Sequence, residues 1–186
     1  MENFRWDSGT AGWIEIRGKK LEAIAHGPPP GAAPTIVMLH EGLGCLELWR
    51  DFPQRLAEMT GMGVFAWSRA GYGKSAPVEL PRPLDYMTRE AMEMLPQILD
   101  SIGFQPRGIL LGHSDGASIA AIYAGGVEDF PGSRICADCS AFLHREMGLK
   151  AIEAARNAYD NADLREKLWR YHADVDNVSR LERGLA

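Results

Sequence analysis

The amino-acid sequence predicts an α/β fold with a doubly wound, mostly parallel sheet, and three observations support this prediction. Short apolar runs suited to buried strands alternate with segments of helical periodicity. Three of these runs are followed by polar residues, His40, Ser68 and Ser114, and parallel sheets carry reactive side chains at the carboxyl ends of their strands. A chain of 186 residues, 46% apolar and 24% charged, is also sufficient for one globular domain.

The first forty residues predict a β-hairpin and then a central strand of the sheet. Residues 13–17 and 21–25 have the composition of two short strands, and the turn at Gly18 between them predicts a β-hairpin. A loop rich in proline and glycine follows over 26–34. The continuous apolar run 35–39 then indicates a central strand that is buried on both faces.

Helices and strands alternate in the next part of the chain. Apolar residues at helical spacing predict a helix over 48–59, and residues 64–67 predict the next strand. A second helical stripe covers 87–102 and contains Pro96, which we expect to kink the helix.

The most informative pattern is an apolar strand, 108–111, that leads into Gly-x-Ser-x-Gly and then into a helix of small residues over 116–124. This pattern is typical of a nucleophile elbow, a sharp strand-to-helix turn that lifts one hydroxyl above the sheet. Gly112 and Gly116 suit the turn because larger side chains would collide with neighbouring backbone. Ser114 is therefore the candidate catalytic nucleophile.

A glycine-rich loop, His-Glu-Gly-Leu-Gly over 40–44, follows the predicted central strand. Taken alone, it is typical of an ordinary turn. Beside an elbow, its glycines let backbone N–H groups face a developing oxyanion. We expect the oxyanion hole to consist of the N–H of Gly42 and the N–H of Asp115, which directly follows the nucleophile.

These motifs resemble the α/β-hydrolase superfamily, in particular bacterial members. The resemblance extends from about residue 12 to about residue 127. It rests on the loop 40–44, on Leu-Trp-Arg-Asp-Phe-Pro over 48–53, on Ser-Arg-x-Gly-Tyr-Gly-x-Ser over 68–75, and on Gly-His-Ser-Asp-Gly over 112–116. It implies a serine hydrolase that cleaves a carboxylic ester, a thioester or a related acyl bond. The alternative for loop 68–75, a phosphate-binding loop, lacks a following helix start, so we predict a structural role for it.

The chain order of the superfamily implies that an acid and then the catalytic histidine follow the nucleophile. We therefore expect His40 and His113 to order their loops through hydrogen bonds, and Asp115 to contribute its amide rather than its carboxylate. Only His144 and His172 follow Ser114. We expect His172 to be a solvated or packing residue rather than a triad base.

The resemblance places the acid and the base beyond a helical lid. We expect residues 1–146 to form the N-terminal part of the hydrolase core, 147–180 a partial helical lid and 181–186 a tail, so that the C-terminal strands and both triad partners are missing. Very weak or no activity is then expected. The alternative function is a truncated or frameshifted hydrolase remnant without catalysis.

Residues 131–145 contain polar residues and cysteines where a sixth apolar strand is expected, so they do not predict a central strand. Back-translated with a permissible choice of codons and read one nucleotide later, residues 130–147 yield an apolar strand and loop similar to the family's. Residues 179–186, treated in the same way, yield a stretch similar to the family's continuation. We therefore hypothesise that both stretches are out of frame. Natural divergence is the alternative.

The composition limits the partners. A formal net charge of −5 gives no basic surface for nucleic acid, and no apolar run reaches the length of a membrane helix. Of the three cysteines, Cys136 and Cys139 form a C-x-x-C pair, but a zinc site would also need a second such pair or a histidine pair at zinc spacing, and the sequence has neither. We therefore expect the cysteines to be incidental. A cytoplasmic protein with a small-molecule acyl substrate, no metal and no cofactor is expected.

Overall fold

The computed structural model describes residues 4–6, 9–79, 81–128, 132–138, 157 and 163–172. The strands are β1 (Gly12–Ile16), β2 (Lys19–His26), β3 (Thr35–Leu39), β4 (Gly63–Trp67), β5 (Gly108–His113) and β6 (Gly132–Asp138). The helices are α1 (Phe52–Thr60), α2 (Tyr86–Arg89), α3 (Leu95–Ser101), α4 (Asp115–Gly126) and α7 (Asp163–Trp169).

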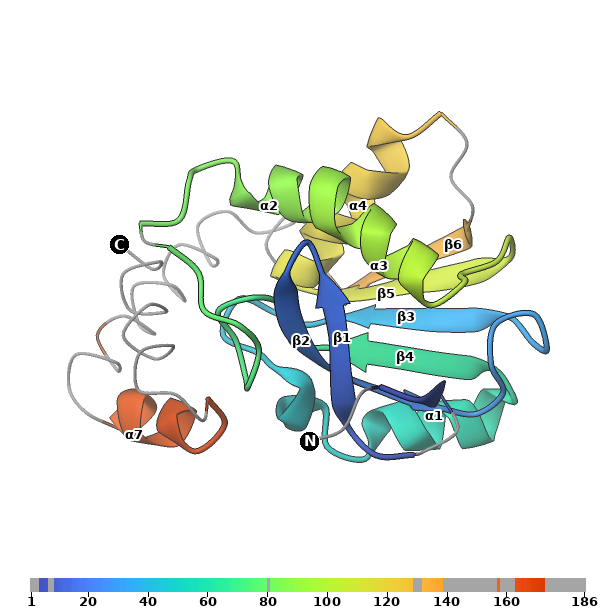
Figure 1. Cartoon of the computed structure of the whole chain (residues 1–186), viewed down its shortest axis with the longest axis horizontal. Coiled ribbons are helices and arrows are strands. Elements are labelled where there is room, and N and C mark those ends of the chain that lie inside the picture. Colours follow the sequence, from blue (N-terminus) through green and yellow to red (C-terminus); the bar gives the residue numbers. More distant parts are fainter. Residues whose placement is uncertain are drawn as a thin grey trace.

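The six strands form one sheet in the order β1-β2-β4-β3-β5-β6. The pairs β3–β4, β3–β5 and β5–β6 are parallel, whereas β1–β2 and β2–β4 are antiparallel. Helices α2, α3 and α4 lie over one face of the sheet and α1 lies over the other (Figure 1). The predicted α/β class, with a doubly wound and mostly parallel sheet, is confirmed.

The hairpin predicted near the N-terminus is also confirmed. Strands β1 and β2 pair from Ile16 and Lys19 outward, and the two residues between them, Arg17 and Gly18, have φ values of 52° and 71°. Two consecutive residues with positive φ give a turn whose twist matches that of the flanking strands. The tight turn therefore fixes the register of this edge.

The core lies on both faces of the two central strands, β3 and β4. Alternate residues pack against opposite layers: Val37, Leu39 and Phe65 belong to the cluster that includes α3 and α4, and Met38 and Val64 to the cluster that includes α1. All of them are almost fully buried. Each such side chain stabilises the fold by roughly 1.5–3 kcal/mol relative to an exposed one. The expected central strand 35–39 is therefore correct.

The helix predicted over 48–59 begins later than expected. A short 3-10 helix spans Leu46–Trp49, and Arg50 after it has φ 52°, a value that interrupts helical geometry. Helix α1 then starts with Pro53 in its first turn, where the missing N–H has no helical partner to lose. It ends at Gly61, whose φ of 66° allows the left-handed cap that donates to the carbonyl of Ala57.

The helix predicted over 87–102 is divided into three pieces. A π-helical turn, Glu90–Met94, separates α2 from α3. Pro96 cannot donate a backbone hydrogen bond, and its ring crowds the carbonyl four residues earlier, so the turn before it widens. The predicted single helix is therefore interrupted before Pro96 by a π-helical turn, and the kink expected at Pro96 stays a prediction.

The first half of 131–145 does form the sixth strand, β6, so the inference that this strand is missing is wrong. In the described sheet β6 lies at the edge, which agrees with the prediction that the stretch is not a central strand. It pairs in parallel with β5, with a register irregularity near Gly108. Parallel pairing is made by backbone groups, and β6 has a described neighbour only on its β5 side, so a continuous apolar run is not required there. Residues 139–145 and 179–186, on which the frame hypothesis also depends, lie outside the described residues.

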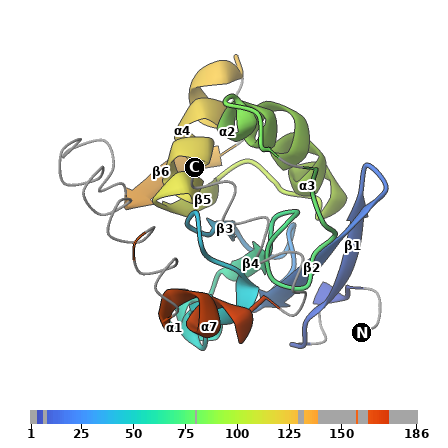
Figure 2. The same ribbon diagram turned by 90° about the vertical axis from the view of Figure 1, so that its left-hand side faces the viewer.

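Within the predicted lid, the structure describes α7 and residues 170–172 together with residue 157. Helix α7 lies on the side of the molecule to which the carboxyl ends of β3 and β4 point, and in Figure 2, which faces that side, it is seen in front of α1. The boundaries at 146 and 180 stay predictions. In the described ranges, no helix is both long and apolar enough to cross a bilayer.

Candidate active site

Ser114 occupies a sharp turn between β5 and α4. Its φ of 50° and ψ of −114° lie in a region that favours glycine, and a non-glycine residue there stores about 1–3 kcal/mol of strain. The carbonyl of Ser114 accepts hydrogen bonds from the N–H groups of Ala117 (2.9 Å) and Ser118 (3.1 Å). These contacts hold the turn, and the backbone has the geometry expected of an elbow.

The two elbow glycines allow α4 to approach β3 closely. A Cβ at Gly116 would meet the carbonyl of Leu39 and lie 2.8 Å from the carbonyl oxygen of His40. A Cβ at Gly112 would meet the first backbone atoms of α4. Glycine at both positions therefore brings Ser114 against the end of β3, where loop 40–44 begins.

Gly42 and Asp115 lie side by side in this arrangement. A Cβ at Gly42 would lie 3.1 Å from Oδ2 of Asp115 and 3.3 Å from Oδ1. Asp115 is the first residue of α4, where N–H groups have no acceptor within the helix and the helix dipole is positive. The structure thus brings together the predicted nucleophile, Ser114, and the two residues predicted to supply oxyanion amides.

The peptide group between Glu41 and Gly42 is held from its oxygen side. The Glu41 carbonyl lies within hydrogen-bond distance of three groups: the N–H of Gly44 (3.1 Å), Nη2 of Arg69 (3.1 Å) and Nδ1 of His40 (2.7 Å). In a planar trans peptide the N–H points opposite to the carbonyl. The Gly42 N–H is therefore directed away from these three groups.

His40 is a structural histidine. Its Nε2 accepts the backbone N–H of Arg69 at 3.0 Å, so Nδ1 carries the proton that it donates to Glu41. Burial, together with the nearby Arg69 guanidinium, lowers the pKa of His40 well below its ordinary value, so the ring stays neutral. The prediction that His40 orders its loop is confirmed.

The remaining described histidines after β3 also contact loops. Nδ1 of His113 lies 3.5 Å from Oε2 of Glu41. His172 is fully buried, and its Nδ1 accepts the N–H of Gly73 at 2.9 Å. His172 was expected to be either solvated or a packing residue, and the structure shows that it is a packing residue. His144 lies outside the described residues.

The carboxylate of Asp115 is bound within the protein. The hydroxyl of Tyr86 donates a 2.5 Å hydrogen bond to Oδ2, and Nη2 of Arg69 lies 3.8 Å from the same oxygen. Burial and the adjacent carboxylate raise the pKa of Tyr86 well above its ordinary value, so the phenol remains a donor. Sequence reasoning missed Tyr86, which no motif marks, and it gave Arg69 only the structural role of its loop.

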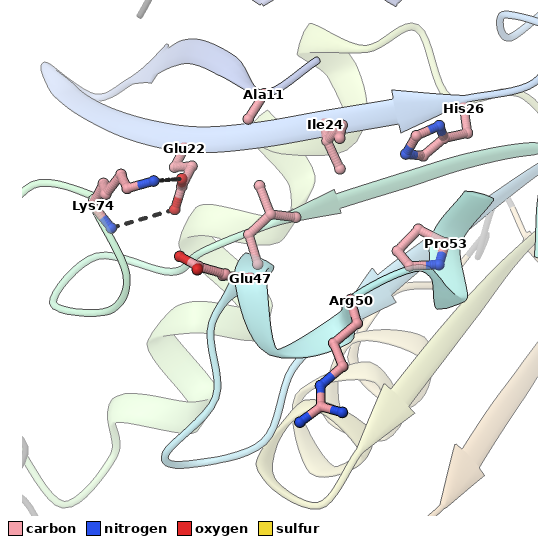
Figure 3. A pocket seen from close by; sticks show the side chains of 9 residues that line it. Ala11, Glu22, Ile24, His26, Glu47, Arg50, Pro53 and Lys74 are labelled. Carbon is pink, nitrogen blue, oxygen red and sulfur yellow. Dashed lines mark hydrogen bonds and ion pairs between the residues drawn. The ribbon is translucent and has the colours of Figure 1, made fainter. Parts of the chain in front are cut away.

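Loop 68–75 is tied to β2 by Glu22. The Glu22 carboxylate, only 4% exposed, accepts hydrogen bonds from the hydroxyl of Ser68 (3.1 Å) and the N–H of Lys74 (3.3 Å), and the Lys74 ammonium lies 3.5 Å away. Figure 3 shows Glu22 and Lys74 at one end of a hollow of about 320 Å³. Ser68 and Lys74 thus donate hydrogen bonds to the Glu22 carboxylate, and the Lys74 ammonium balances its charge. These contacts agree with the structural role predicted for the loop.

Helix α7 and the residues that follow it contact two loops of the site. Leu168 packs against Leu43, and the thiol of Cys45 donates to the carbonyl of Tyr171 at 3.8 Å. Together with the bond between Gly73 and His172, these contacts fix α7 next to loop 40–44. The described part of the predicted lid therefore adjoins the candidate oxyanion donors.

Comparison with known proteins identifies one family. The profile of the family described as alpha/beta hydrolase fold matches residues 34–129. Epoxide hydrolase B of Mycobacterium tuberculosis is 29% identical over 113 residues. The match covers 60% of this chain and 30% of that protein, so the chain spans about a third of the length of this curated relative.

Solved structures show the same fold at low sequence identity. Epoxide hydrolase A from Mycobacterium thermoresistibile has 24% identity and a TM-score of 0.55, over 69% of this chain and 38% of that one. An epoxide hydrolase from metagenomes of hot environments has 17% identity and a TM-score of 0.67, over 96% and 70%. A bacterial membrane phospholipase A has 17% identity and a TM-score of 0.64, over 94% and 62%.

Proposed function

The chain belongs to the α/β-hydrolase fold family, and on this basis we propose that it is a serine hydrolase of carboxylic esters, thioesters or related acyl bonds. The observation that carries the proposal is the strained turn at Ser114, which lies beside both Gly42 and Asp115. In the proposed reaction, Oγ of Ser114 bonds to the acyl carbon and its proton passes to water, while the π electrons of the carbonyl move to its oxygen. The resulting oxyanion accepts hydrogen bonds from the N–H groups of Gly42 and Asp115, and its collapse breaks the bond to the leaving alcohol or thiol, which takes up a proton. Water then attacks the acyl-serine in the same way and releases the carboxylic acid and the free serine.

These two donors act mainly in the transition state. Negative charge develops on the substrate oxygen only as the tetrahedral intermediate forms, so fixed donors stabilise that state more than the ground state. One such donor is typically worth about 3 kcal/mol. The positive end of the α4 dipole adds to this effect.

The serine also requires a base. Among the described histidines near the site, His40 and His172 bind backbone groups, and Nδ1 of His113 lies 3.5 Å from the carboxylate of Glu41, so none of these is assigned to Ser114. Loss of a triad member leaves only the contributions of binding and of the oxyanion hole. We therefore expect slow turnover by the 186-residue chain, and a remnant without turnover is the alternative.

Epoxide hydrolysis is a second candidate, because several similar proteins are named epoxide hydrolases. A carboxylate that opens an epoxide forms an ester, which water then cleaves. A serine alkoxide would instead form an ether, which does not hydrolyse under the same conditions. The serine at the elbow therefore favours acyl substrates, and the neighbouring Asp115 carboxylate is already bound to Tyr86.

Turnover of p-nitrophenyl acetate by purified wild type, Ser114→Ala and Ser101→Ala tests the proposal. Ser101 is a matched hydroxyl at the end of α3, bonded to its own helix. We expect turnover that persists in Ser101→Ala and disappears in Ser114→Ala. Equal rates in wild type and Ser114→Ala would favour the remnant, and styrene oxide hydrolysis that depends on Asp115 but not on Ser114 would favour the epoxide reaction.

A further inference from the structure

Arg69 is one of the most deeply buried side chains of the protein. It follows β4 by two residues, and its side chain is only 1% exposed. A buried guanidinium is costly unless its charge and its donors are matched. Among the described residues, its Nε and Nη1 have no hydrogen-bond partner. The burial of Arg69 is therefore hard to explain by stability alone. The polar contacts of its guanidinium with Glu41 and Asp115 are both made by Nη2.

The nitrogen Nη2 spans the two halves of the proposed oxyanion hole. It donates to the Glu41 carbonyl at 3.1 Å, in the peptide group that contains the Gly42 N–H. It also lies 3.8 Å from Oδ2 of Asp115. One side chain therefore contacts the peptide that carries one donor and the residue that carries the other.

The charge of Asp115 makes the second contact important. A Cβ added to Gly42 would lie 3.1 Å from Oδ2 of Asp115, so the carboxylate adjoins Gly42, whose N–H is one of the two proposed oxyanion donors. A negative charge there opposes the developing charge of the substrate oxygen. The positive charge of Arg69 and the hydrogen bond from Tyr86 both offset it.

We propose that Arg69 is a positioning residue of the oxyanion hole, which orients the Glu41–Gly42 peptide and compensates the charge of Asp115. This inference rests on the proposed acyl hydrolysis. It assigns Arg69 no contact with the substrate, since the guanidinium acts through the two residues that bear the donors.

Arg82 provides a matched control. The guanidinium carbons of Arg69 and Arg82 lie 5.0 Å and 4.7 Å from the centre of the Tyr72 ring. However, Nη2 of Arg82 donates to the carbonyl of Ala70 at 2.8 Å and not to Glu41. The Arg82 guanidinium carbon also lies 5.6 Å from the centre of the Tyr86 ring. Replacing Arg82 therefore removes an arginine from both rings, while the Tyr86 hydroxyl keeps its bond to Asp115 and the Glu41–Gly42 peptide keeps its bond to Arg69.

The kinetic test compares Arg69→Met, Arg82→Met and the double variant Arg69→Met/Asp115→Asn on p-nitrophenyl acetate. We expect Arg69→Met to lower kcat about tenfold or more, with KM changed by less than about twofold, since the affected donors act in the transition state. Arg82→Met should retain the wild-type kcat. The double variant should regain part of the lost kcat, because it removes the uncompensated carboxylate.

Three results would overturn the proposal: an unchanged kcat in Arg69→Met, an equal loss in Arg82→Met, or no recovery in the double variant. If Arg69→Met does not fold, Arg69→Lys keeps the charge, and its kcat should then fall below that of wild type while KM is retained. A kcat equal to that of wild type would contradict the need for the guanidinium.

A second measurement separates this proposal from the proposed function. The amide resonances of Gly42 and Asp115 in a nitrogen–proton NMR spectrum need no turnover. They should shift in Arg69→Met and remain in place in Arg82→Met. If wild type has no Ser114-dependent turnover, the proposed function fails and these resonances decide: shifts confined to Arg69→Met support the positioning role, and unchanged resonances overturn it.

Discussion

Replacing Gly116 by alanine should destabilise the protein, although alanine is the better helix former. Gly116 is the second residue of α4, and a Cβ there would meet the carbonyl of Leu39 and lie 2.8 Å from the carbonyl oxygen of His40. These backbone atoms lie at the end of β3, so an added Cβ fits only if α4 or β3 shifts. Forced overpacking typically costs about 1–3 kcal/mol, and rigid backbone neighbours place this site near the upper value. Alanine recovers at most about 1 kcal/mol of helix propensity.

The net expectation is a loss of about 2 kcal/mol in the free energy of unfolding. For a chain of this size the melting temperature should fall by about 4–8 °C. Gly125→Ala is the matched control, because Gly125 lies in the same helix and a Cβ there would meet no atom within 4 Å. It should leave stability unchanged or raise it by up to about 1 kcal/mol. Urea unfolding of both variants measures this, and a Gly116→Ala variant as stable as Gly125→Ala would refute the close approach that builds the site.

Three further predictions concern stability. Arg50 has φ 52° and ψ −125°, so Arg50→Gly should raise the unfolding free energy by up to about 1 kcal/mol, seen as a higher urea midpoint; a lower midpoint would contradict the strain. Burial lowers the pKa values of both His40 and His172 below 6.5. Their contribution to stability is therefore complete above pH 6.5 and declines as the pH falls from there toward the lowered values, at up to about 1.4 kcal/mol per pH unit for each histidine. His172→Gln should flatten the fall in urea midpoint between about pH 7 and pH 5, and an unaltered pH dependence would count against the buried neutral ring. Leu168→Ala should speed amide hydrogen exchange in α7 because it removes the buried contact with Leu43, whereas Leu84→Ala, at an exposed position, should not; equal exchange in both would contradict the docking of α7.

The features predicted from sequence are those that local sterics and burial determine. Gly112 and Gly116 mark the elbow because no other residue fits between β5, α4 and the end of β3. The run 35–39 predicts a central strand because both of its faces are buried. In each case, the residue types in a short run of sequence are enough to predict the local structure.

The features that were missed depend on partners distant in sequence or on the backbone alone. Tyr86 reaches Asp115 across 29 residues, and no pattern around Tyr86 indicates this contact. Arg69 bonds to Glu41 across 28 residues. β6 forms by backbone pairing with β5, which apolar patterning does not detect. The late start of α1 follows from the positive φ of Arg50, a conformation that arginine rarely adopts.

Covalent labelling of the nucleophile tests the central claim most directly. The purified chain is incubated with a fluorophosphonate, which phosphonylates activated serines, and peptide mass spectrometry then locates the adduct. Because no described base activates Ser114, the proposed oxyanion hole predicts an adduct that forms slowly on Ser114, is absent from Ser114→Ala, and forms more slowly still in Arg69→Met than in Arg82→Met. An adduct on another residue, or an unmodified Ser114 after prolonged exposure, would contradict the assignment of Ser114 as the nucleophile.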